Sequence, residues 1–121
     1  MALAHFYFLM ELPKINWRQR LLMLVGRRRL LQVEGDSMHP TLKSGDVVLI
    51  DPHAFIVVGD IVVAQHPYKQ SVKMIKRVES IDPGGRYALK GDNPNGSTDS
   101  RTLGTIAKAD IAGKVICRVS N

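Results

Sequence analysis

A serine in a tight turn is the first residue of this sequence whose type and surroundings suggest chemistry. Ser37 lies within residues 34–40, which read EGDSMHP. Gly35 allows the backbone to turn tightly before the serine, and Pro40 stiffens the exit from the turn. A serine held in this way presents its hydroxyl and leaves its own backbone N–H to face a developing oxyanion. Ser37 is therefore a candidate nucleophile, although many serines in such turns are purely structural.

A lysine on an apolar strand face is the matching candidate base. Residues 72–78 read VKMIKRV, and strand alternation places Lys76 on one face with Val72, Met74 and Val78. Burial there disfavours the charged ammonium form and lowers the pKa of a lysine, as a general base near neutral pH requires. The alternative is that Lys76 extends into solvent from the edge of a sheet.

The third candidate segment, residues 91–101, reads GDNPNGSTDSR and is dense in turn-forming residues. A plain surface loop is the simplest interpretation of such a composition. The functional interpretation is an ordered loop in which Ser97 hydrogen-bonds the lysine amine. Asp99 would then pair with a base such as Arg101 or Arg77. Arg77 lies on the strand face opposite the candidate base, where we expect it to be solvated.

Histidine-based and metal-based chemistry find less support. His39, His53 and His66 each lie beside a proline, and none has a carboxylate partner at a distinctive spacing. A Ser-His-Asp site is therefore not favoured. The single cysteine, Cys117, excludes a cysteine-rich metal site and an internal disulfide. We predict neither a metal nor a cofactor.

The elements that must position these residues are short strands. Apolar, β-branched runs alternate with Gly-Asp and proline punctuation from residue 30 onward, which predicts a mainly β domain over residues 30–121. The predicted strands are Leu30–Glu34, Asp46–Ile50, Asp60–Gln65, Val72–Ser80, Tyr87–Lys90 and Lys114–Val119.

Residues 1–29 form a basic N-terminal arm. Trp17, Leu21, Leu22 and Leu24 stand among arginines and predict a short amphipathic helix. Residues 1–30 carry a net charge of +5 out of +6 for the whole chain, so the main domain is nearly neutral. This distribution argues against a nucleic-acid-binding domain. No apolar stretch reaches the roughly 20 residues that a membrane span needs. The sequence predicts a cytoplasmic protein whose arm can touch a membrane surface or an acidic partner.

Four boxes of residues, in order, resemble those of the type I signal peptidases. They are a nucleophile box over residues 35–46, a strand box over 59–63, a general-base box over 76–78 and a last box over 91–104. One box alone would be weak evidence, whereas four in the family's order are specific. The resemblance implies a serine endopeptidase with a signal peptidase-like or LexA-like β-barrel-type catalytic core, which follows the helical arm.

The resemblance also implies roles for individual residues. Ser37 would be the nucleophile and Lys76 the general base of a Ser-Lys dyad. Ser97 would orient Lys76, and Met38 would pack against the lysine and keep it dry. The other supporting residues of the implied site are Gly35, Asp36, Arg77, Asp99 and Arg101. Some family members carry a serine two residues before the nucleophile as an oxyanion donor. Gly35 stands there in this chain, so the oxyanion hole would rely on the Ser37 N–H.

The substrate is predicted from a finer resemblance. Residues 62–67 and 91–101 resemble the branch of nickel-type superoxide dismutase maturation proteases, which implies removal of an N-terminal propeptide from a superoxide dismutase precursor. One alternative is a signal peptidase that cleaves exported preproteins at a membrane, although this chain lacks the expected anchor. Another is a self-cleaving regulatory module of the repressor type. The only Ala-Gly bond, at residues 112–113, lies downstream of the serine, which disfavours self-cleavage.

Overall fold

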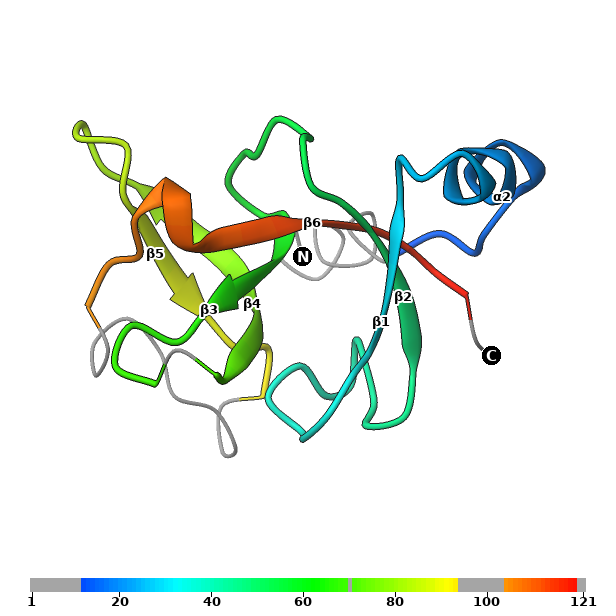
Figure 1. The fold of residues 1–121 in the computed structure, drawn as a ribbon. Coiled ribbons are helices and arrows are strands. Elements are labelled where there is room, and N and C mark those ends of the chain that lie inside the picture. The colour runs from blue at the N-terminus through cyan, green and yellow to red at the C-terminus, as the bar shows by residue number, and fades with distance from the viewer. Residues whose placement is uncertain (1–11, 70, 94–103, 120–121) are drawn as a thin grey trace, which may run out of the picture.

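The computed structural model describes residues 12–69, 71–93 and 104–119. Within these ranges one short helix precedes a six-stranded sheet (Figure 1). The elements are α2 (Trp17–Leu24), β1 (Arg29–Gln32), β2 (Val47–Asp51), β3 (Ile61–Gln65), β4 (Lys73–Ile81), β5 (Tyr87–Lys90), the 3-10 helix η1 (Lys108–Asp110) and β6 (Ile111–Arg118). The prediction of a mainly β fold is confirmed, as is the short helix in the arm.

All neighbouring strands pair antiparallel, in the order β1-β2-β6-β3-β4-β5. Strand β6 therefore lies between β2 and β3 and joins two halves of the sheet (Figure 1). It begins at Ile111, three residues before the predicted start. Gly113 interrupts the apolar pattern there, because a Cβ at this position would lie 2.4 Å from Ile50 Cγ2 and 2.9 Å from the Asp51 carbonyl oxygen. Glycine marks a close backbone approach in this strand.

The strongly coiled sheet buries side chains on both faces. On β3, Ile61 and Val63 belong to one core cluster, whereas Val62 and Ala64 belong to a second. A strand that is buried on both faces carries a continuous apolar run, which is the pattern at this position. The first cluster joins β3 to β2, β6 and the turn that carries Ser37. The second joins β3 to β4 and β5.

Helix α2 begins at a side-chain cap and is fastened to the sheet by the segment before it. Asn16 accepts a hydrogen bond from the Gln19 N–H at 3.0 Å, which satisfies a free donor of the first turn. Ile15 N–H donates to the Arg118 carbonyl at 3.1 Å, and Arg118 N–H donates to the Pro13 carbonyl at 2.9 Å. Among the described residues, no helix is long and apolar enough to cross a membrane.

Candidate active site

The turn between β1 and β2 presents Ser37. Its ends are joined by hydrogen bonds from Val33 N–H to the Asp46 carbonyl at 2.7 Å and from Gly45 N–H to the Val33 carbonyl at 2.8 Å. Met38 is 1% exposed and anchors the turn in the first core cluster. Gly35 has a φ of +82°, in the left-handed region that glycine adopts without strain. The predicted tight turn is therefore present, and it leaves Ser37 half-buried.

Lys76 is enclosed in the sheet. It is 5% exposed, and Met74 and Val78 on the same strand face are also buried. Strand β4 lies between β3 and β5, so the alternative of a solvated lysine at a sheet edge is wrong. Val72, in contrast, is 42% exposed and does not share the buried face. The reason is that β4 begins at Lys73, which leaves Val72 in the preceding turn.

The serine turn meets the lysine strand next to the lysine itself. The Ser37 hydroxyl donates to the carbonyl oxygen of Ile75 at 3.4 Å, and Ile75 immediately precedes Lys76. Ile75 packs in the same core cluster as Met38, so an apolar contact supports this polar one. The two segments are 38 residues apart in sequence, and they meet through the backbone carbonyl that precedes Lys76.

The segment after β5 holds the serine turn from its other side. Asn93 donates its backbone N–H to the Ser37 carbonyl at 3.0 Å and its side-chain amide to the Asp36 carbonyl at 3.0 Å. No individual role was expected for Asn93 from the sequence. The only sequence signal for Asn93 was its position in the last box. Every residue has a backbone carbonyl, so the identities of Asp36 and Ser37 do not reveal that these carbonyls accept hydrogen bonds from Asn93.

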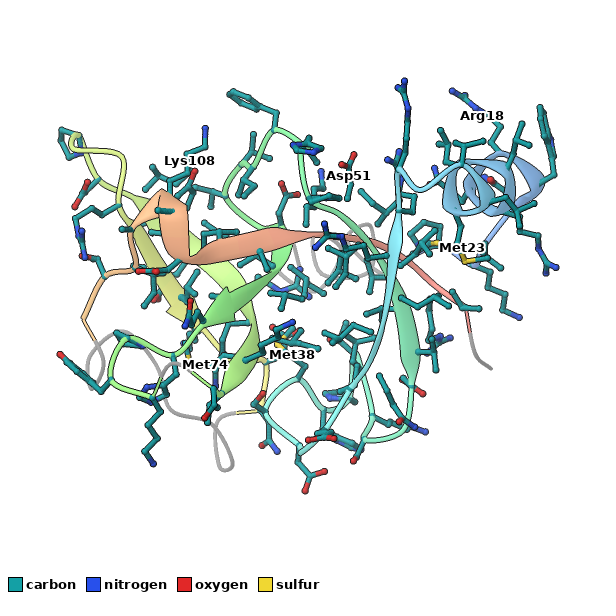
Figure 2. All side chains as sticks on the ribbon, in the orientation of Figure 1. Arg18, Met23, Met38, Asp51, Met74 and Lys108 are labelled. Carbon is teal, nitrogen blue, oxygen red and sulfur yellow. The ribbon has the colours of Figure 1, made fainter. Side chains whose placement is uncertain are left out.

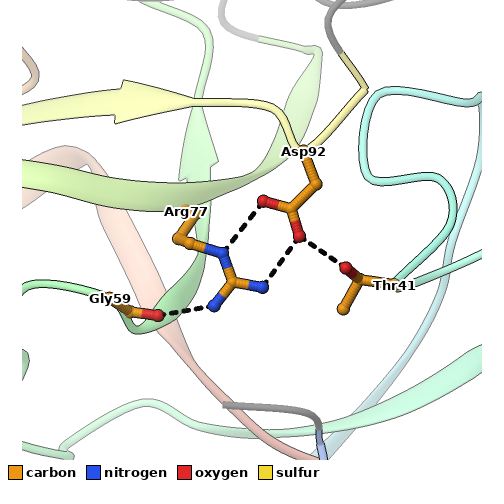
Figure 3. Close-up of polar contacts among 4 residues, drawn as sticks. All are labelled: Thr41, Gly59, Arg77 and Asp92. Atoms are coloured by element: carbon orange, nitrogen blue, oxygen red, sulfur yellow. Dashed lines mark hydrogen bonds and ion pairs between the residues drawn. The ribbon is translucent and has the colours of Figure 1, made fainter. Parts of the chain in front are cut away.

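A partly buried ion pair joins the same three segments (Figure 3). Arg77 donates from Nε to Asp92 Oδ1 at 2.9 Å and from Nη2 to Asp92 Oδ2 at 2.7 Å. Its Nη1 donates to the Gly59 carbonyl at 2.8 Å, and Thr41 donates its hydroxyl to Asp92. The Arg77 side chain is 11% exposed, so the expectation that it would be solvated is wrong. A two-point pair with fixed geometry explains why a guanidinium is kept here.

The electrostatics of this pair favour the ionised carboxylate. Burial alone raises the pKa of Asp92, but the hydrogen bonds from Arg77 and Thr41 and the charge of Arg77 outweigh burial and hold that pKa below its ordinary value. Thr41 and Asp92 were missed as site residues. The pairing of Arg77 with Lys90 across β4 and β5 could have pointed to Asp92, which lies two residues beyond Lys90.

A cavity of about 580 Å³ opens beside this pair. Its lining includes Pro40 and Thr41 of the serine turn, Arg77 and Glu79 of β4, and Asp92. Neither Ser37 nor Lys76 lines the cavity, so it adjoins these two candidate residues without containing them.

The remaining candidate residues either lie outside the described ranges or have a structural role. Ser97, Asp99 and Arg101 lie outside the described residues. The ring of His66 accepts the Tyr68 and Lys69 N–H groups at 3.1 Å each, which is a structural role in the β3–β4 turn. Within the part of the chain that the structure describes, no cluster of three potential metal ligands occurs.

The segments of the candidate site fall within a match to a known protein family. The family model described as Peptidase S24-like matches residues 12–116. The chain belongs to the Peptidase S24-like family. The match includes the serine turn, the lysine strand and the segment after β5, so family membership covers every part of the candidate site.

Several relatives of this S24-like chain are known. It is 37% identical over 108 residues to mitochondrial inner membrane protease subunit 1 of Xenopus tropicalis, a match that covers 70% of this chain and 65% of the relative. It is 29% identical to the Homo sapiens subunit 1, covering 74% and 68%. It is 32% identical to mitochondrial ATP-independent inner membrane protease subunit 1a of Arabidopsis thaliana, covering 72% and 67%. The chain thus spans about two thirds of each relative.

These names bear on the sequence-based expectations. They support the resemblance to signal peptidase-like proteases. They do not extend to the narrower resemblance, since these relatives are named as inner membrane proteases and not as superoxide dismutase maturation proteases. The predicted cytoplasmic location has no support from them either.

Proposed function

We propose that this chain is a serine endopeptidase of the signal peptidase type, which removes N-terminal segments from precursor proteins with Ser37 as nucleophile and Lys76 as general base. The observation that carries the proposal is the contact of Ser37 Oγ with the carbonyl of Ile75, the neighbour of a lysine that is 5% exposed. The names of the S24-like relatives support a protease that works at a membrane in preference to a soluble maturation enzyme.

The mechanism follows from the two side chains. The neutral amine of Lys76 accepts the proton of the Ser37 hydroxyl as its oxygen attacks the scissile carbonyl. The resulting ammonium then donates that proton to the leaving amine, and an acyl-enzyme remains on Ser37. Lys76 next accepts a proton from water as the water oxygen attacks the ester, and it returns this proton to the Ser37 oxygen as the second product leaves. The Ser37 N–H would stabilise the oxyanion in both steps.

Burial gives Lys76 the environment that this cycle needs. A charged ammonium is costly in an apolar setting, so enclosure between Met74 and Val78 favours the neutral base. Asn93 holds the serine turn directly. The ion pair of Arg77 with Asp92 also holds it, because Asp92 accepts a hydrogen bond from Thr41 of the turn. Such positioning is worth as much as the base itself, because misplacement by about 1 Å can cost about 100-fold in rate.

The test is a cleavage assay with the purified full chain. Synthetic precursors that include leader segments of exported proteins and the N-terminal extension of a nickel superoxide dismutase are incubated with it and the products are identified by mass spectrometry. We expect Ser37→Ala and Lys76→Ala each to abolish cleavage, with Ser80→Ala and Lys73→Ala, at exposed positions of β4, as matched controls. Cleavage by Lys76→Ala at the normal rate would refute the dyad.

The same panel decides between the substrate classes. Preferential cleavage of exported leaders supports the signal peptidase reading. The prediction that the substrate is a superoxide dismutase precursor rests on the resemblance of residues 62–67 and 91–101 alone. Selective cleavage of the N-terminal extension of that precursor would establish this narrower prediction. A change in the intact mass of the enzyme without substrate would indicate the self-cleaving alternative.

A further inference from the structure

Helix α2 turns an apolar stripe away from the protein. Trp17, Leu21 and Leu24 follow the i, i+4, i+7 spacing of one helix face, and they are 74%, 54% and 80% exposed. Val25, which caps the helix, is 62% exposed beside them. A surface helix ordinarily turns such a stripe toward the core. The outward stripe of α2, defined as Trp17, Leu21 and Leu24, therefore calls for a partner.

The helix is held in this orientation. Its inward side already carries Gln19, Leu22 and Met23, all half-buried. Arg28 donates from Nε to Gln19 Oε1 at 3.0 Å and pairs with Asp51 of β2 at 3.2 Å. Together with the strand-like contacts of residues 13–15 with β6, these bonds hold the N-terminal half of α2 to the sheet. The stripe cannot rotate inward without breaking them.

Positive charge surrounds the stripe. At 100° per residue, Arg18 and Arg20 project on opposite sides of Trp17, and both are exposed. Figure 2 shows Arg18 on the outer side of the helix. Residues 12–33 contain no acidic residue, and their basic residues are Lys14, Arg18, Arg20, Arg27, Arg28 and Arg29. Any partner must therefore offer an apolar layer bordered by negative charge.

We propose that α2 lies in the interface of an anionic lipid membrane, with its outward stripe among the acyl chains and its flanking arginines on lipid phosphates. A tryptophan and leucines on one face with arginines beside them are the composition of interfacial helices. An eight-residue helix is about 12 Å long, too short to span a bilayer but suited to lie in its plane. Tryptophan and arginine are also enriched in protein interfaces, so a second copy of the chain is included below as an outcome of the test.

The chain carries its own probe for this contact. Trp17 is the only tryptophan, so its fluorescence reports on the outward stripe alone. The full chain is titrated with vesicles of phosphatidylcholine containing phosphatidylglycerol, and with vesicles of phosphatidylcholine alone. We expect a blue shift and protection from an aqueous quencher with the anionic vesicles only, and we expect added salt to reverse both. This inference does not depend on the proposed protease activity, because the readout involves no cleavage.

Variants separate the apolar and the charged contributions. Leu21→Ser with Leu24→Ser should weaken vesicle binding about tenfold or more, since it removes two leucines from the buried face. Arg18→Gln with Arg20→Gln should reduce the preference for anionic lipid, because each basic residue near the surface contributes to it. Tyr68→Ser and Lys69→Gln, at exposed positions of the β3–β4 turn, are the matched controls and should bind as the parent does. All of these side chains are exposed, so thermal unfolding should stay unchanged.

Three outcomes would overturn the proposal. The first is the absence of a Trp17 shift with anionic vesicles, or an equal and salt-insensitive shift with neutral ones. The second is full vesicle binding by the double leucine variant. Loss of binding on deletion of residues 1–11 would then assign the contact to those residues instead. The third is a lipid-independent shift that grows with protein concentration and disappears in the leucine variant, which would assign the stripe to a second copy of the chain.

Discussion

Asn93 donates its backbone N–H to the carbonyl of Ser37 at 3.0 Å, and its side chain reaches the carbonyl of the preceding Asp36 at the same distance. The candidate nucleophile is therefore held by a residue 56 positions later in the chain, on the segment that follows β5. Both bonds go to the main chain, so they fix the path of the turn without engaging the hydroxyl of Ser37, which donates to the Ile75 carbonyl.

Replacement of Asn93 by Asp should reduce kcat on the order of tenfold with little change in KM. The substitution is isosteric, but it replaces an N–H donor by an oxygen that faces the Asp36 carbonyl, which shifts the turn. Steady-state kinetics on a cleaved precursor measure the effect, and a thermal melt checks that the fold is intact. Equal kcat values for variant and parent would show that Asn93 does not position the serine.

The rate of cleavage should rise with pH and level off well below pH 10. Lys76 is 5% exposed, and a buried lysine loses its proton more readily than a solvated one, whose pKa is ~10.4. The rate is measured at saturating substrate across pH, and Lys76→Arg serves as the control because a guanidinium stays protonated. A midpoint near the value for a solvated lysine would contradict the role assigned to burial.

Acid should weaken the fold partly through Asp92. Its folded pKa lies below the ordinary value of 3.8, so the ionised carboxylate stabilises the native state above about pH 4. This contribution is lost as the pH falls through the folded pKa, because the unfolded chain takes up the proton first. Urea unfolding from pH 7 to pH 3 should show parent and Asp92→Asn converging in acid. A constant difference between them would contradict the linkage.

Gly113→Ala should destabilise the protein by about 1–3 kcal/mol, the usual cost of overpacking. The new Cβ would lie 2.4 Å from Ile50 Cγ2 and 2.9 Å from the Asp51 carbonyl, where the backbone of β2 cannot give way cheaply. Urea unfolding measures the loss. Gly84→Ala in the β4–β5 turn is the control, because its one close neighbour, at 3.3 Å, is the end of the Asp82 side chain. Equal stability of both variants would show that β2 and β6 can separate.

Cys117 should react with thiol reagents only when the protein unfolds. It is 1% exposed on β6, and burial raises the pKa of its thiol, although the charge of Arg28 partly opposes the shift. Both effects of burial, low access and a small thiolate fraction, slow the reaction. The rate of labelling in rising urea should follow the unfolding transition. Fast labelling of the native protein at neutral pH would be the contrary result.

Local patterns were sufficient for much of this fold. The apolar, β-branched run at Ile61–Gln65 predicted β3 closely, because a strand that is buried on both faces is apolar throughout. The bounds of β5 were also predicted, although this edge strand alternates between buried and more exposed residues. The apolar pattern placed the start of β6 too late, because Gly113 interrupts the apolar run. A glycine is needed there because β2 approaches closely, which its neighbours in sequence do not show. A contact between strands that are distant in sequence leaves a weak local signal.

The residues of the candidate site also differ in how far local sequence could identify them. Ser37 and Lys76 were identified because each stands out within its own segment, a polar residue in a tight turn and on an apolar face. Thr41 and Asp92 were missed because their importance arises only when β4, β5 and the serine turn come together. Arg77 was expected in solvent because strand alternation says which face a residue occupies, not what covers that face.

The position of β6 has a consequence for the order of events during synthesis. The strands of the serine turn, β1 and β2, and those of the lysine, β3 and β4, are made first, yet in the sheet they pair with each other only through β6. A ribosome-bound chain that lacks residues 111–118 therefore has the β1–β2 pair and the β3–β4–β5 unit without their shared strand. The serine turn and the lysine strand should come together in one step, after β6 has emerged.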